Sequence, residues 1–285
     1  MSTEINPVVN IEEVEEQKTP SAPKRLKRVK LIVAYDGTNY HGWQVQPNGE
    51  TIEGVLNRTL SSLLGEKIIV TGASRTDAGV HSMGNVAVFD TKSRIPAEKI
   101  SYALNQWLPE DIVVQKSEEV PADFHPRHCD CCKTYEYDIL NRTFPLPAYR
   151  NTAYFLYGDL DLDAMRRACQ AFPGEHDFAS FCAAGAQVQT TVRTIYSLEV
   201  LEQPLAVTGR GVSSQRSPER LLTIRVRGNG FLYNMVRIIA GTLVEVGRGH
   251  IRPEEVEGII AACDRAKAGP TAPARGLRLV EIKYD

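Results

Sequence analysis

The loop between two apolar segments of this chain reads Ser74-Arg75-Thr76-Asp77-Ala78-Gly79-Val80-His81. Glycines at positions 72, 79 and 84 surround its polar residues, and glycine permits tight turns and close backbone approach. A short loop held between two strands can fix a carboxylate in one position. Asp77 is therefore a candidate nucleophile, general base or metal ligand. The alternative is an aspartate that only caps a turn.

Apolar periodicity on both sides of this loop predicts alternating strands and helices. Leu31, Val33 and Tyr35 alternate with Lys30, Ile32 and Ala34, as in a strand buried mainly on one face. Residues 51–64 repeat apolar side chains at helical spacing, and Gly65 fits the end of that helix. Further strands are predicted at 67–71, 85–90, 112–116, 134–140, 194–201, 221–227 and 278–283, and further helices at 96–107, 162–172, 231–246 and 253–263. The similar order in both halves predicts two related α/β lobes.

Composition separates a predicted tail from the folded part of the chain. Residues 1–20 hold five glutamates against one lysine, a local charge of −4. We predict a disordered acidic tail over 1–25, an N-terminal lobe over 26–132 and a C-terminal lobe over 133–285. Residues 203–219 are polar and rich in Gly, Ser and Arg, which favours an exposed hairpin loop or insertion.

Charge and hydropathy limit the classes of function. The net charge is −2, but a local basic surface is enough to bind a phosphate backbone. A basic run follows the tail and consists of Lys24, Arg25, Lys27, Arg28 and Lys30. The alternative is that these basic residues are simply exposed to solvent where the first strand begins. No apolar stretch approaches the roughly 20 residues of a membrane span, and no secretion signal is present, so we expect a cytoplasmic protein with reduced cysteines.

Arg237 is unusual because it lies within an otherwise apolar predicted helix. Buried arginine is uncommon unless it pairs with an acid or a phosphate. Phe231, Asn234, Arg237 and Gly241 share one face at helical spacing. The alternative is a surface arginine whose stem lies along apolar neighbours.

Tyr135 and Tyr137 lie two residues apart on one predicted strand, beside Lys133. Aromatic rings next to a cation can stack on a base and hold its phosphate, although ordinary core tyrosines show the same pattern. A second cluster consists of His125, His128, Cys129, Cys131 and Cys132. Its spacing does not match paired zinc-binding motifs, so we predict no metal there.

These motifs together resemble the tRNA pseudouridine synthase A family. Residues 74–81 are similar to its Gly-Arg-Thr-Asp-Ala-Gly-Val-His signature. Other segments that resemble the family, in the same order, are 35–44, 133–137, 176–178 with 191–194, and 230–237. The resemblance extends from about Val29 to the C-terminus. Ser74 departs from it, because the family usually has glycine there, and Ser82-Met83 replaces smaller residues.

The resemblance implies an α+β fold of the pseudouridine synthase type. In it, two α/β lobes share a mixed, mainly antiparallel sheet with a central RNA-binding cleft. The implied activity is isomerisation of uridine to pseudouridine in the tRNA anticodon stem-loop, typically at nucleotides 38 to 40. The implied protein is a homodimer that needs no cofactor and no metal.

The resemblance also assigns roles by position. Asp77 would be the nucleophile and must act ionised. Arg237 would pair with its carboxylate, and a nearby arginine lowers a carboxylate pKa, so we expect a low pKa for Asp77. Tyr135 would stack on the target base and assist later proton handling. Arg75 would displace and hold the flipped nucleotide, while Thr76 and His81 would contribute further substrate contacts.

Three alternatives stay open. The first is a synthase that acts on another tRNA site or RNA class. The second is a non-catalytic RNA-binding module, and the third is a hydrolase that holds a metal with Asp77 and His81. The hydrolase would need further ligands at suitable spacing, which the sequence does not offer.

Overall fold

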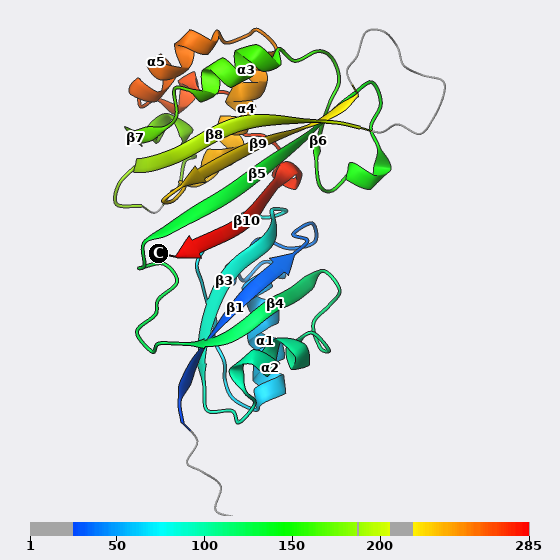
Figure 1. Cartoon of the computed structure of the whole chain (residues 1–285), viewed down its shortest axis with the longest axis vertical. Helices are drawn as coiled ribbons and strands as arrows, with labels where there is room; N and C mark the ends of the chain where they lie inside the picture. The colour runs from blue at the N-terminus through cyan, green and yellow to red at the C-terminus, as the bar shows by residue number, and fades with distance from the viewer. Residues whose placement is uncertain (1–24, 187, 206–218, 285) are drawn as a thin grey trace, which may run out of the picture.

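The computed structural model describes residues 25–186, 188–205 and 219–284 (Figure 1). The predicted tail over 1–25, apart from Arg25, and most of the predicted loop over 203–219 lie outside these residues. Within them the chain forms the expected α+β fold. The strands are β1 (Lys27–Tyr35), β2 (Thr71–Gly72), β3 (His81–Thr91), β4 (Ile112–Val120), β5 (Cys131–Asn141), β6 (Tyr154–Leu156), β7 (Gly174–Asp177), β8 (Val192–Pro204), β9 (Arg220–Gly228) and β10 (Leu277–Tyr284). The α-helices are α1 (Ile52–Leu64), α2 (Ala97–Leu104), α3 (Leu162–Cys169), α4 (Met235–Gly247) and α5 (Val256–Ala261).

One mixed sheet connects the two ends of the molecule. Its strand order is β4-β1-β3-β10-β5-β9-β8-β7, with β2 beside β3 and β6 beside β5. Strand β10 lies between β3 and β5, parallel to the first and antiparallel to the second. Leu279 of β10 aligns with Ser82 on one side and with Tyr135 on the other. The last strand in the chain therefore joins the two strands on which the predicted site depends (Figure 1).

Two apolar cores lie on either side of this junction. The first packs α1 and α2 against β1, β3 and β4, with Trp43, Leu56 and Ile100 almost fully buried. The second packs α3, α4 and α5 against β5, β8 and β9, with Phe172 and Phe178 fully buried. Leu56 and Ile100 lie on the buried faces of predicted helices, whereas Trp43 and Phe178 reach the cores from loops.

Local sequence explains where α1 begins and ends. The Thr51 hydroxyl accepts a hydrogen bond from the Gly54 amide at 3.2 Å, as expected of a residue that caps a helix. Gly65 adopts the left-handed conformation, with φ of 64°, and ends the helix. The predicted helix over 51–64 is confirmed.

Some predicted elements were wrong in extent or kind. Residues 67–70 are not a strand, because side chains of α1 bond their backbone amides: Ser61 accepts from Ile68, and Asn57 accepts from Val70. Helix α4 begins at Met235, four residues later than predicted, because Asn234 before it has a positive φ of 59°. The helix predicted over 253–263 divides into a 3-10 turn, Pro253–Glu255, and the short α5. Strands β6 and β7 were not predicted.

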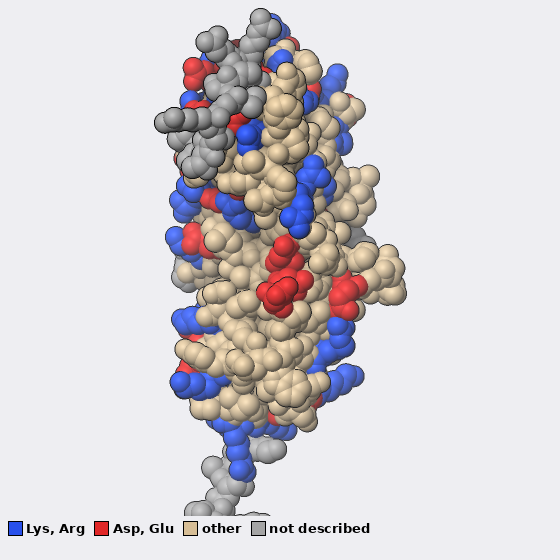
Figure 2. Space-filling view, turned by 90° about the vertical axis from the view of Figure 1, so that its right-hand side faces the viewer, with Lys and Arg blue, Asp and Glu red and all other residues tan. Residues whose placement is uncertain are grey.

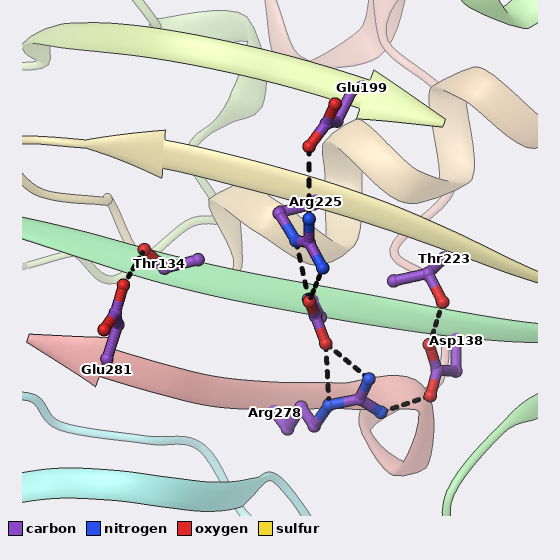
Figure 3. Close-up of polar contacts among 8 residues, drawn as sticks. Thr134, Asp138, Glu199, Thr223, Arg225, Arg278 and Glu281 are labelled. Carbon is purple, nitrogen blue, oxygen red and sulfur yellow. Dashed lines mark hydrogen bonds and ion pairs between the residues drawn. The ribbon is translucent and has the colours of Figure 1, made fainter. Parts of the chain in front are cut away.

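An ion-pair network crosses one face of the sheet (Figure 3). Glu136 on β5 accepts hydrogen bonds from Arg225 on β9, at 2.7 Å, and from Arg278 on β10, at 3.0 Å. Arg278 also pairs with Asp138, which accepts a further bond from Thr223 at 2.7 Å. Burial would raise the pKa of Glu136, but the hydrogen bonds and charges of Arg225 and Arg278 hold it below its ordinary value. Since neighbouring strand residues face opposite sides, this network fixes β5 from the side opposite Tyr135.

Arg278→Met is expected to lower the free energy of unfolding by about 3 kcal/mol at pH 7, because it leaves two buried carboxylates short of a partner. The folded-state pKa of Glu136 is lowered, so its contribution to stability is present above the unfolded pKa. That contribution is lost as the pH falls through the folded pKa. The deficit of the variant should therefore shrink in acid. Urea unfolding of both proteins at pH 7 and in acid measures how far the variant's loss of stability shrinks.

Lys283→Met is the matched control, because Lys283 forms an exposed ion pair with Glu281 on the same strand. It should change the stability by less than about 1 kcal/mol. Equal losses in the two variants would contradict a special role of the Arg278 network.

The surface seen from the side in Figure 2 mixes both signs of charge. Acidic side chains gather near the middle of that face, with lysine and arginine toward its edges. This face is not the continuous basic surface that a phosphate backbone favours. No helix in the described part of the chain is both long enough and apolar enough to span a membrane.

Candidate active site

A cavity of about 620 Å³ lies where the loop containing Asp77 meets β5 and the start of α4. Its size falls within the roughly 300–1,000 Å³ typical of ligand sites. The lining combines loop residues 73–78, Lys133 and Tyr135 of β5, and residues 231–236. Segments far apart in the sequence therefore converge on one cleft.

The loop that carries Asp77 is held against residues 40–43. The Trp43 amide donates to the Thr76 carbonyl at 3.0 Å, and the Gly79 amide donates to the Tyr40 carbonyl at 3.2 Å. Gly42 has a φ of 87°, and a Cβ there would lie 2.5 Å from the Thr76 carbonyl oxygen. Only glycine allows this close approach. The two sequence motifs, 35–44 and 74–81, thus form one packed unit.

Buried polar side chains of β1 and β3 hold the loop that carries Asp77. Asn85 of β3 accepts from the Ser74 amide at 3.3 Å and donates to the Ser74 carbonyl at 3.0 Å. The hydroxyl groups of Tyr35 and Thr76 lie 2.8 Å apart. Both are buried, so this contact is shielded from competing water. Asp77 is therefore presented by a loop whose neighbours are anchored to two strands.

Asp77 and Arg237 lie together, although 160 positions separate them in sequence. Nη1 of Arg237 donates to Oδ2 of Asp77 at 3.2 Å and to Oδ1 of Asn234 at 2.7 Å. Its Nε donates to the Ala272 carbonyl at 2.8 Å. The two paired side chains are 17% and 22% exposed, so the ion pair is largely removed from water. Asn234, in its uncommon left-handed conformation, helps to aim the arginine.

The pKa of Asp77 differs from our expectation. We expected Arg237 to hold it low. Burial raises the pKa of Asp77, and the charge and hydrogen bond of Arg237 lower it only in part, so the pKa lies above its ordinary value. The carboxyl group has little contact with water, and one arginine does not compensate for the lost hydration.

Tyr135 lines the cleft but is almost fully buried. The side chain is 8% exposed, and its ring packs edge-to-face against Phe231 with centroids 5.2 Å apart. Little of the ring is free to stack on a base. Burial raises the pKa of Tyr135 to about 12, so the phenol keeps its proton even well above neutral pH. The predicted stacking surface is therefore small in this conformation.

The cleft also contains Arg75, Lys133 and residues that the sequence did not single out. Arg75 is exposed in its lining, as expected of a residue that meets RNA. The amine of Lys133 donates to the Ala73 carbonyl at 3.2 Å and ties β5 to the loop. Among the lining residues that we did not single out are His41, Gln44, Gln46, Arg127, Leu232 and Tyr233. Most of these six lie in the family-like segments 35–44 and 230–237, which were the only signal that marked them.

His81 was expected to contact the substrate, and the structure does not place it in the lining of the cleft. Its ring is buried behind the loop. Nδ1 lies 3.1 Å from the Gly37 amide and 3.0 Å from Oδ1 of Asp36, and Nε2 lies 2.8 Å from the Asn151 carbonyl. These bonds join the loop to residues near 151. His81 therefore supports the site and does not line it, which also removes it as a metal ligand beside Asp77.

The cluster around Cys129, Cys131 and Cys132 has no metal-binding arrangement. In the described ranges, no group of three or more His, Cys, Asp or Glu side chains is placed to hold a metal ion. The rings of His125 and His128 stack on each other at 3.9 Å. Cysteines at 129, 131 and 132 are free thiols.

Comparison with known proteins gives one consistent match. The family model described as tRNA pseudouridine synthase matches residues 31–128 and 168–285. The chain is 49% identical to tRNA pseudouridine synthase A of Ruminiclostridium cellulolyticum and 47% identical to that of Acetivibrio thermocellus. The protein of the same name from Brevibacillus brevis is 45% identical. Each similarity extends over 259 residues, which is 91% of this chain and 100% of the relative.

Proposed function

This chain belongs to the tRNA pseudouridine synthase family, and we propose that it isomerises uridine to pseudouridine at nucleotides 38 to 40 of the tRNA anticodon stem-loop. The observation that carries the proposal is the Asp77–Arg237 ion pair, whose carboxylate lines the cleft together with Tyr135. A module that only binds RNA does not require a carboxylate and an arginine withdrawn from water.

The reaction breaks the bond between C1′ and N1, rotates the uracil and rejoins it to C1′ through C5. No redox or hydrolytic step occurs. A base inside a duplex cannot reach a protein carboxylate, so the nucleotide must leave the stack. A cavity of about 620 Å³ is large enough to receive it. Arg75, exposed at the edge of the cleft, is placed to hold the displaced nucleotide.

We assign Asp77 as the nucleophile and Arg237 as its partner. Asp77 acts as a carboxylate, either on C1′ or by removing a ribose proton, and both routes use the same group. Arg237 keeps the carboxylate oriented by its bonds to Asp77 and Asn234. Thr76, buried beside Tyr35, positions the loop and reaches the cleft wall.

We further propose a homodimer located in the cytoplasm, with lobes over 26–132 and 133–285. The support for the dimer and the location is the resemblance to the family. The support for the lobes is the pair of apolar cores, one from residues 29–114 and the other mainly from residues 135–279.

The direct test is to incubate unmodified tRNA with the protein and to map pseudouridine at each uridine. Conversion at nucleotides 38 to 40, unchanged by excess chelator, is the expected result. Conversion only at another tRNA site or in another RNA would show a pseudouridine synthase with a different target and would overturn the assignment to nucleotides 38 to 40. Tight tRNA binding without any conversion would favour the non-catalytic module.

Tyr135→Phe is expected to slow pseudouridine formation by about 100-fold with little effect on tRNA binding. The variant keeps the ring and its packing on Phe231 but removes the phenol, and a positioned acid or base contributes about 10² to 10⁴ in rate. Single-turnover rates and tRNA dissociation constants measure the two effects. A wild-type rate would leave Tyr135 with a packing role only.

A further inference from the structure

Ser74 places a buried hydroxyl in the wall of the cleft. The residue is 4% exposed, and its Oγ has no hydrogen-bond partner of good geometry in the described part of the chain. A buried hydroxyl without a partner costs free energy that an alanine would avoid. Such a group calls for an explanation, because most buried polar atoms are paired.

The backbone of Ser74 fixes the direction of this hydroxyl. Two hydrogen bonds with Asn85 hold its amide and its carbonyl. Ser74 is not among the residues with positive φ, so the backbone is unstrained with a side chain present. Its side chain lines the same cavity as Tyr135 and Asp77. The Oγ atom itself is closed off from solvent, so it has no direct access to an RNA substrate.

Tyr135 lies next to Ser74 in the wall of the cleft. Both residues line the cavity, and Lys133, two residues before Tyr135 on β5, donates to the carbonyl of Ala73, the residue before Ser74, at 3.2 Å. Burial raises the pKa of Tyr135 to about 12, and the Ser74 hydroxyl acts in the opposite direction. No well-formed hydrogen bond joins the two hydroxyls in the free protein. Hydrogen bonds at active sites are often long in the free enzyme and tighten around the substrate.

We propose that Ser74 is a positioning residue for Tyr135: its hydroxyl donates a hydrogen bond to the phenol oxygen and turns the phenol O–H toward the base in the cleft. A phenol oxygen can accept one hydrogen bond while it donates another. With Ser74 as the donor behind it, the phenol has its own proton free for the uracil. The inference rests on the proposed function, and it concerns the chemical step and not tRNA binding.

A double-mutant cycle tests this coupling. Single-turnover rates are compared for wild type, Ser74→Ala, Tyr135→Phe and the double variant, with tRNA dissociation constants for each. Ser74→Ala should slow the reaction about tenfold, the size of one lost hydrogen bond, with the dissociation constant within about twofold of wild type. In the Tyr135→Phe background the same substitution should change the rate by less than about twofold.

Two further variants separate the hydroxyl from simple packing. Ser101→Ala removes another buried serine side chain, on α2 and away from the cleft, and should leave the rate unchanged. Ser74→Thr keeps a hydroxyl and adds bulk, so it should retain most of the activity that Ser74→Ala loses. If Ser74 only packs, Ser74→Thr should slow the reaction more than Ser74→Ala does. This comparison separates the hydroxyl from packing even where Tyr135→Phe is too slow to measure.

The outcomes are distinct. An equal loss from Ser74→Ala in both backgrounds, or no loss in either, overturns the positioning role while leaving the proposed function intact. A wild-type protein that forms no pseudouridine in any tRNA overturns the proposed function itself.

Discussion

Asp77→Asn is expected to abolish pseudouridine formation, with a loss of at least about 10⁴-fold, while tRNA binding stays close to wild type. Removal of a single catalytic nucleophile typically costs losses of this size. The amide has nearly the shape of the carboxylate, so the cleft and its RNA contacts are preserved. Pseudouridine mapping under single-turnover conditions measures the loss of activity, and a binding assay with the same tRNA measures the dissociation constant.

The same substitution should not destabilise the fold. Burial raises the folded-state pKa of Asp77 above its ordinary value, so ionisation of this carboxyl opposes folding at neutral pH. This cost shrinks as the pH falls through the folded pKa and is gone below the unfolded pKa, and a neutral amide removes it at every pH. We therefore expect an unchanged or higher melting temperature at pH 7. Loss of activity with a lower melting temperature would point to misfolding and not to lost chemistry.

Asp90→Asn is the matched control for this experiment. Asp90 also pairs with an arginine, Arg28, but on β3 and outside the lining of the cleft. It should leave the rate of pseudouridine formation unchanged. Normal conversion by Asp77→Asn would refute the assignment of the nucleophile.

Arg237→Met is expected to raise the pKa of Asp77 further and to shift the acid side of the pH–rate profile to higher pH. Burial already raises this pKa, and Arg237 supplies the opposing charge and hydrogen bond. Since the carboxylate is the active form, activity is lost as the pH falls through the raised pKa. A neighbouring opposite charge lowers a carboxylate pKa by about 1–3 units, and each unit changes the ionised fraction about tenfold on the acid side. The rate on the acid side of the profile should therefore fall by about tenfold or more and recover as the pH is raised.

Arg237→Lys separates charge from geometry. Lysine keeps the positive charge but not the bond from Nε to the Ala272 carbonyl. Its profile should lie closer to that of wild type than the Arg237→Met profile does. Melting temperatures of both variants check that the start of α4, where Arg237 lies, is still folded. An acid limb in Arg237→Met at the same pH as in wild type would contradict the pairing.

Sequence patterns predicted most elements of the fold because the patterns are local. Apolar residues at helical spacing marked α1, Gly65 marked its end, and alternating apolar residues marked β1. The strand predicted over 67–71 was wrong because side chains from α1 bond its backbone, a contact that no local pattern encodes. Strands β6 and β7 are short, and their pairing depends on long neighbours.

Sequence patterns singled out individual residues of the site but not the contacts among them, because those contacts join segments far apart in the chain. An arginine inside an apolar helix indicated either a buried partner, an acid or a phosphate, or a surface position, which made Arg237 a candidate before its partner was known. The sequence did not reveal that burial outweighs this arginine at Asp77, because hydration depends on the assembled cleft. It likewise did not reveal that the His81 ring bonds Gly37 and Asn151 behind the loop.

The position of β10 has a consequence for the order of events during synthesis. It is the last strand along the chain, yet it lies between β3 and β5 and so separates the Asp77 loop from Tyr135 by one strand. Domains fold as they emerge from the ribosome, beginning with the N-terminal part. The first core can assemble early, but the two walls of the cleft cannot reach their final distance until residues up to Tyr284 have emerged. A nascent chain therefore carries its nucleophile long before it can act on RNA.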